Sequence, residues 1–180
     1  MITSRMLNFP LLRQTYEYDC GAKALHSVLI YYNIDVSEAE VIKVTKTNFQ
    51  GTSAEGIVKA AKHFGLKPSE EILDINKLKK YIKKRIPVIV LIQAWPKRKI
   101  INWRHHWSDG HYIVAIGYDR KKIYFADPYS ILVTYLTYDE LKERWHDIDS
   151  SVNKKYYNLG IPILGNGKAY RNPKQIIHLD

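Results

Sequence analysis

Four side chains of this sequence could together carry out acyl transfer: those of Gln14, Cys20, His111 and Asp127. The thiol of Cys20 is a nucleophile, and the imidazole of His111 can take its proton near neutral pH. The carboxylate of Asp127 could accept the Nδ1–H of that imidazole, which would fix the tautomer and stabilise the imidazolium. The Gln14 amide and the Cys20 backbone N–H could hold the oxyanion of a tetrahedral intermediate. The predicted chemistry is attack on a carbonyl carbon through an acyl-enzyme.

Each of these residues also has an ordinary structural interpretation. A lone cysteine is most often a small buried apolar residue, and Gln14 could lie on the surface. His111 could be a hydrogen-bonded core histidine, and Asp127 could begin a turn before Pro128. The set is more informative than its members. A cysteine on a helix start, with a histidine and an aspartate on neighbouring strands, is typical of two-lobed cysteine hydrolases.

The first half of the chain has the apolar spacing of helices, one of which would position the thiol. This helix is expected to begin at Cys20, with Asp19 as its N-cap, and to end at Asn33. The free N–H groups and the dipole at such a helix start favour a thiolate. Three more helices are expected at about 38–46 after Ser37, from Thr52-Ser53 to Gly65, and at about 76–85.

The second half of the chain has the β-branched and aromatic runs of strands. Pro87–Gln93 is a continuous apolar run, which predicts a central strand buried on both faces. A capping box predicts a helix at about 138–146. Apolar stretches at 159–164 and 176–179 predict a terminal hairpin that extends the sheet. Further strands are expected at His111–Tyr118, Ile123–Ala126 and Ile131–Leu136.

The register of the predicted hairpin tests the pairing of His111 with Asp127. The two side chains share a sheet face if residue 113 pairs with residue 127, because successive side chains alternate between the faces. If residue 114 pairs with residue 127 instead, they point to opposite faces. The catalytic interpretation therefore predicts the first register, or a bulge that restores it.

Composition and charge exclude several other classes of protein. The chain has 180 residues, 46% of them hydrophobic and 26% charged, as in one globular domain rather than a disordered tail. It has no apolar run near the length of a membrane span, about 20 residues, and no signal peptide. A single cysteine excludes a disulfide framework and a Cys-rich zinc site and fits the reducing cytoplasm. The net charge of +10 is divided evenly between the halves, so no nucleic-acid partner is expected.

The loop from Trp95 to Gly110 is long and rich in tryptophan and histidine. Loops of this length are often functional. Its tryptophans could line a cleft or form a lid packed on the strands, and the sequence favours neither. His105 and His106 are adjacent, which is not the one-face spacing of a metal site, so no metal or cofactor is expected.

Three segments of the chain resemble the bacteriocin-processing double-glycine peptidases, which are papain-like cysteine peptidases. The resemblance covers roughly residues 10–145, and its set of motifs is fairly specific. The segments are Gln14–Leu25 (QTYEYDCGAKAL), Asp109–Asp119 (DGHYIVAIGYD) and Ile123–Pro128 (IYFADP).

The resemblance implies a papain-like α+β fold in a single domain over 1–180. A helical lobe over 1–86 would carry the nucleophile. An antiparallel sheet lobe over 87–180, with a C-terminal extension, would carry the histidine and the aspartate. The implied roles are nucleophile for Cys20, general base for His111, orienting residue for Asp127 and oxyanion donor for Gln14.

Exporters of this family join the peptidase to membrane and ATP-binding domains, which this chain lacks, so a stand-alone member is expected. The resemblance implies leader peptides cut after Gly-Gly as substrates, and a membrane exporter could be a partner. One alternative is another acyl-transfer enzyme on the same residues: a deamidase, a transglutaminase or an isopeptidase. A second is a non-catalytic module that binds peptides. The mass of the products would separate cleavage from deamidation and cross-linking.

Overall fold

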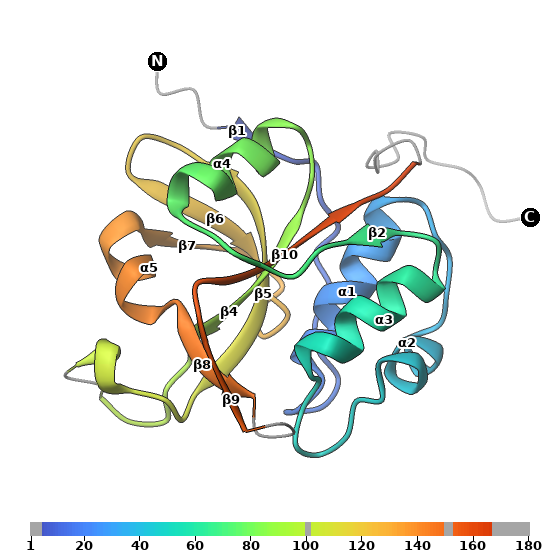
Figure 1. The fold of residues 1–180 in the computed structure, drawn as a ribbon, viewed down its shortest axis with the longest axis horizontal. Helices are drawn as coiled ribbons and strands as arrows, with labels where there is room; N and C mark the ends of the chain where they lie inside the picture. Colours follow the sequence, from blue (N-terminus) through green and yellow to red (C-terminus); the bar gives the residue numbers. More distant parts are fainter. Residues whose placement is uncertain (1–4, 100–101, 150–152, 167–180) are drawn as a thin grey trace, which may run out of the picture.

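The computed structural model of the protein describes residues 5–99, 102–149 and 153–166 (Figure 1). Its fold is α+β, as the sequence predicts. The helices are α1 (Cys20–Tyr31), α2 (Glu38–Thr45), α3 (Ala54–His63), α4 (Ile75–Lys83) and α5 (Tyr138–Arg144), with a 3-10 turn at Trp103–His105. The strands are β1 (Arg5–Met6), β2 (Lys67–Pro68), β3 (Glu71–Ile72), β4 (Val88–Gln93), β5 (Gly110–Tyr118), β6 (Lys122–Ala126), β7 (Val133–Thr137), β8 (His146–Asp149), β9 (Lys154–Tyr157) and β10 (Leu159–Leu164).

The main sheet is antiparallel, in the order β2-β10-β4-β5-β6-β7, and β8 and β9 form a separate hairpin. β1 pairs with the end of β5, and β3 pairs with β10. Every residue of β4 is buried, because other strands flank it and helices cover both of its faces. The predicted central strand is therefore confirmed.

Alternate residues of β4 pack against two different layers of helices. Ile89 and Leu91 belong to a core with α1, α2 and α3, whereas Val88, Val90 and Ile92 belong to a core with α4 and α5. Figure 1 shows the first three helices on one side of the sheet and the other two on the opposite side. The period of two along a strand explains how one apolar run serves both cores. The division into lobes over 1–86 and 87–180 stays a prediction.

Three helices, α2, α3 and α5, begin at the capping residues that the sequence predicts. Ser37 and Ser53 each accept the N–H of the third residue along, and Thr137 completes a capping box with Glu140. These bonds satisfy N–H groups that have no partner within the helix. α5 ends at Arg144, two residues before the predicted end, because the chain then turns into β8.

The last described strands differ in part from the predicted terminal hairpin. β10 covers the stretch 159–164 and does extend the sheet, with β4 on one side and β2 and β3 on the other. The other predicted arm, 176–179, lies outside the described residues. The hairpin of β8 and β9 is not predicted by the sequence, because β8 (His-Asp-Ile-Asp) is short and polar.

The hairpin of β5 and β6 has the register that the catalytic interpretation requires. Val114 pairs with Ala126, which places residue 113 opposite residue 127. This register depends on the bulge between Ala115 and Gly117, because the pairs nearer the turn would on their own place residue 114 opposite residue 127. The prediction is therefore confirmed in its second form, a bulge that restores the required register.

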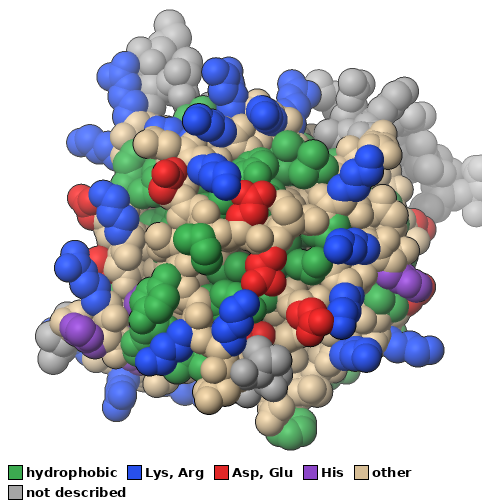
Figure 2. Space-filling view, in the orientation of Figure 1, with side chains coloured by type: hydrophobic (Ala, Val, Ile, Leu, Met, Phe, Trp, Pro, Cys, Tyr) green, Lys and Arg blue, Asp and Glu red, His purple; other side chains and the backbone are tan. Residues whose placement is uncertain are grey.

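Basic side chains are spread over the face of the molecule that Figure 2 shows. On the face in Figure 2, Lys and Arg side chains are scattered and interleaved with acidic ones. In the segments 5–99, 102–149 and 153–166, no helix combines the length and the apolar character needed to cross a membrane.

Candidate active site

Cys20 is the first residue of α1, at the point where this helix meets β5. Its side chain is half-buried and lines a cavity of about 280 Å³. The next residue allows the close approach, because a Cβ at Gly21 would lie 2.7 Å from the Cβ of Thr52 and 3.0 Å from the ring of Tyr112. The Cys-Gly pair therefore lets a helix start pack directly against the loop before α3 and against β5.

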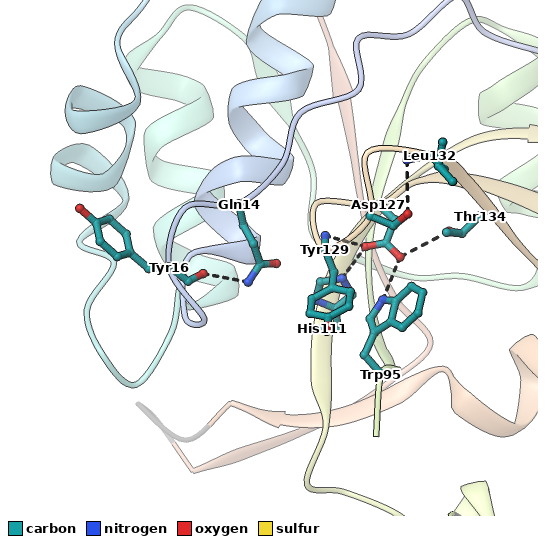
Figure 3. Close-up of polar contacts among 9 residues, drawn as sticks. Gln14, Tyr16, Trp95, His111, Asp127, Tyr129, Leu132 and Thr134 are labelled. Atoms are coloured by element: carbon teal, nitrogen blue, oxygen red, sulfur yellow. Dashed lines mark hydrogen bonds and ion pairs between the residues drawn. The ribbon is translucent and has the colours of Figure 1, made fainter. Parts of the chain in front are cut away.

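His111 and Asp127 form a buried pair across the hairpin of β5 and β6. Nε2–H of His111 donates to Oδ1 of Asp127 over 2.7 Å (Figure 3). The expectation that Nδ1 would make this bond is wrong. The ring is oriented so that Nε2 faces the carboxylate, and Nδ1 is the nitrogen left to interact with the thiol of Cys20.

The electrostatics of the pair favour a charged imidazole. Burial favours the neutral ring, but hydrogen bonds and charge from Asp127 and Cys20 outweigh it and raise the pKa of His111 to about 9. Burial would also raise the pKa of Asp127, yet His111, the backbone N–H of Tyr129 and the indole of Trp95 hold that pKa below its ordinary value. The site can therefore hold an imidazolium between a carboxylate and a thiolate.

Four donors converge on the carboxylate of Asp127, and the sequence predicts only one of them. Oδ1 accepts from His111 and, over 2.9 Å, from the backbone N–H of Tyr129. Oδ2 accepts from Nε1–H of Trp95 over 2.9 Å and from the hydroxyl of Thr134 over 3.5 Å (Figure 3). No spacing in the sequence singles out Trp95 for this contact, because it lies in a loop without a periodic pattern.

Asp19 does not cap α1 as predicted. No side-chain bond caps this helix, and the carboxylate turns back to accept the backbone N–H groups of Thr15 and Tyr16 over 3.2 and 3.3 Å. Its side chain is fully buried. Burial raises the pKa of Asp19, although these two N–H groups lower it in part. The physical reason for the difference is that the loop before α1 has its own N–H groups to satisfy.

Gln14 lies at the start of the same loop, beside the segment that follows Asp127. Its backbone N–H donates to the carbonyl oxygen of Pro128 over 2.8 Å. Its side chain donates from Nε2 to the carbonyl oxygen of Tyr16 over 2.8 Å (Figure 3). The structure therefore ties Gln14 to both halves of the site, but its amide contacts Tyr16 rather than Cys20.

The Trp95–Gly110 loop has mixed roles around the cavity at the start of α1. Trp107 lines that cavity, whereas Trp103 packs against the guanidinium of Arg144. Position 110 needs a glycine, because a Cβ there would lie 1.8 Å from Oδ2 of Asp147. Burial raises the pKa of Asp147, which also lines the cavity, to about 6. Within the described segments, His, Cys, Asp and Glu side chains do not gather in threes as metal ligands would.

Comparison with known proteins adds independent information about this arrangement. Residues 8–155 match the Peptidase C39 family. The chain is 28% identical over 136 residues to the pediocin PA-1 transport/processing ATP-binding protein PedD of Pediococcus acidilactici. The match covers 75% of this chain but 17% of that relative, so the chain spans less than a fifth of its length.

Two solved structures have a similar fold. The peptidase domain of ComA from Streptococcus, a bifunctional ABC transporter involved in a quorum sensing pathway, has a TM-score of 0.63 at 28% identity, over 87% of this chain and 98% of that one. A double-glycine-motif protease from an AMS/PCAT transporter, solved in complex with the leader peptide, has a TM-score of 0.63 at 22% identity, over 90% and 95%. The papain-like fold class is therefore confirmed.

Proposed function

The chain belongs to the peptidase C39 family of cysteine peptidases, and from that premise we propose that it cleaves leader peptides after a Gly-Gly pair. We assign the nucleophile to Cys20, the general base to His111, its orientation to Asp127 and an oxyanion donor to Gln14. The observation that carries this proposal is the buried bond between Nε2 of His111 and Oδ1 of Asp127, because it leaves Nδ1 for the thiol.

The reaction follows from these positions. Nδ1 of His111 takes the Cys20 proton, and the thiolate attacks the carbonyl carbon that precedes the scissile bond. The oxyanion accepts the Cys20 backbone N–H and an N–H of Gln14. As the intermediate collapses, Nδ1–H of His111 protonates the leaving amine, and the acyl group stays on sulfur. A water molecule, deprotonated by His111, then releases the acyl group and regenerates the thiol.

The substrate class rests on the relatives rather than on the cavity. PedD is named as a transport and processing protein for pediocin PA-1, and the AMS/PCAT protease binds a leader peptide. Because relatives of this kind join processing to transport, a membrane exporter is the proposed partner. A cytoplasmic location completes the proposal, since a single free thiol fits a reducing compartment.

A synthetic leader peptide with a Gly-Gly junction tests the proposal directly. Incubation with the protein is expected to give two fragments whose masses sum to the peptide plus one water. There are two controls: a matched peptide with Ala-Ala at the junction, incubated with the unmodified protein, and the Gly-Gly peptide, incubated with Cys20→Ala. Neither control should yield fragments. A mass gain of about one dalton without cleavage would indicate deamidation instead, and a joined product would indicate cross-linking.

Gln14→Ala is expected to lower kcat by about 10²–10³, the usual effect of removing one oxyanion donor. KM should change little, because the oxyanion forms only after binding. The measurement is steady-state cleavage of the Gly-Gly peptide, with thermal unfolding to check that the loop before α1 remains folded. Turnover near that of the unmodified protein would remove the oxyanion role from Gln14.

A further inference from the structure

The two carboxylate oxygens of Asp127 have different partners. Oδ1 accepts from His111, and Oδ2 accepts from the indole N–H of Trp95, which follows β4 by two residues. The donor and acceptor of the second bond are 32 residues apart in the sequence. A carboxylate held through both oxygens cannot rotate about its Cβ–Cγ bond without breaking one of two charge-assisted bonds.

The indole is itself held in one place. Trp95 has a φ of +55°, in the left-handed region that bulky residues rarely adopt. Its ring packs on that of Tyr129 with centroids 4.8 Å apart, and the Tyr129 backbone N–H donates to Oδ1 of Asp127. A strained backbone persists only where its surroundings determine it, and such residues cluster at functional sites. Trp95 and Tyr129 therefore clamp the carboxylate from two sides.

We propose that Trp95 is a positioning residue, whose indole N–H fixes the carboxylate of Asp127 so that Oδ1 faces Nε2 of His111. The proposal rests on the proposed function, since positioning matters only if His111 acts on the thiol. Trp95 acts through Asp127 and is not assigned any contact with substrate. Its role differs from that of a simple apolar shield, which a phenylalanine ring would also supply.

Loss of the N–H has a defined electrostatic consequence. Hydrogen bonds to the anion stabilise the ionised form of Asp127, so removing one raises the pKa of that carboxyl group. Asp127 then becomes protonated at a higher pH, and His111 loses the charge that holds its imidazolium. The acid limb of activity should therefore move to higher pH, because the ion pair of Cys20 and His111 fails earlier as the pH falls.

Trp95→Phe tests the proposal, with Trp103→Phe as the matched control. Phenylalanine keeps a ring beside Tyr129 but donates no hydrogen bond, and Trp103 packs on Arg144 and is not one of the four donors to the carboxylate. We expect Trp95→Phe to lower kcat about tenfold or more, in keeping with a lost bond to a charged group, and to leave KM unchanged. The acid limb of the pH–activity profile should move to higher pH. Trp103→Phe should change none of these. An acid limb that stays in place in Trp95→Phe would overturn the proposal.

A second measurement needs no substrate and separates this proposal from the proposed function. The rate at which iodoacetamide alkylates Cys20 reports the assembled thiolate and imidazolium. Trp95→Phe should lower that rate about tenfold near pH 6, and the effect should vanish when Asp127→Ala is already present. If the peptide is not cleaved but this pattern appears, the leader-peptide function fails and the positioning role stands. If Trp95→Phe lowers the alkylation rate by the same factor with and without Asp127→Ala, Trp95 does not act through Asp127.

Discussion

Cys20→Ala is expected to abolish peptide cleavage while leaving the fold and peptide binding intact. Removal of the nucleophile from a serine peptidase costs about 10⁶ in kcat, and the same chemistry is proposed here. Because Cys20 is half-buried at the start of α1, a helix-favouring alanine should pack there with little loss of stability. The measurement is cleavage of the Gly-Gly peptide, with binding of the same peptide followed separately.

Binding can be followed through the protein's own fluorescence. Trp107 lines the cavity that Cys20 opens onto, so a bound peptide should change its emission. The change should be as large in Cys20→Ala as in the unmodified protein, and Cys20→Ser gives a second, nearly isosteric variant. Cleavage by Cys20→Ala at more than a trace would mean that another residue attacks the peptide. If the unmodified protein and Cys20→Ala bind the peptide equally well and neither cleaves it, the protein would be a non-catalytic peptide-binding module.

His111→Ala is expected to lower kcat by a similar factor, because loss of the base in the same serine peptidase costs about as much as loss of the nucleophile. It should also change how alkylation of Cys20 depends on pH. Burial opposes the charged ring, but Asp127 and Cys20 raise the pKa of His111 to about 9, so the ion pair persists below that pH. Without the imidazolium, alkylation of Cys20 below that pH should slow, because no opposite charge then stabilises the thiolate.

The sign of the pH dependence in the unmodified protein follows from the same pKa. His111 must be protonated to give its proton to the leaving amine, so activity should fall as the pH rises through about 9. His63→Ala is the matched control, since His63 is exposed at the end of α3, and it should leave both profiles unchanged. An alkylation profile identical in His111→Ala and the unmodified protein would show that the pair is not assembled.

The elements that position the site could be predicted because their signals are local. Capping residues fix where helices begin, and the period of two fixes which side chains of a strand share a face. The common face of His111 and Asp127 requires one of two registers, and the pairing of Val114 with Ala126 beyond the bulge provides it. A shift of a single residue would have separated the pair, so the prediction was specific.

The contacts that refine the site could not be predicted, because they depend on loops. Trp95 donates to Asp127 from a segment without periodicity. Asp19 accepts hydrogen bonds from the loop before it rather than from the helix after it. The choice of Nε2 over Nδ1 in His111 depends on the orientation of one ring, which no spacing encodes. Such partners are decided by tertiary packing, whereas the sequence pattern constrains only the elements that present them.

The place of β10 sets the order in which a newly made chain can complete its fold. The ribosome adds Cys20, His111 and Asp127 before it reaches Leu159–Leu164, the strand that pairs with the free side of β4. Until then, the nascent chain holds every proposed catalytic residue but leaves an apolar strand edge open to association with other chains. A fragment that stopped at residue 155, where the family match ends, would carry the same open edge permanently.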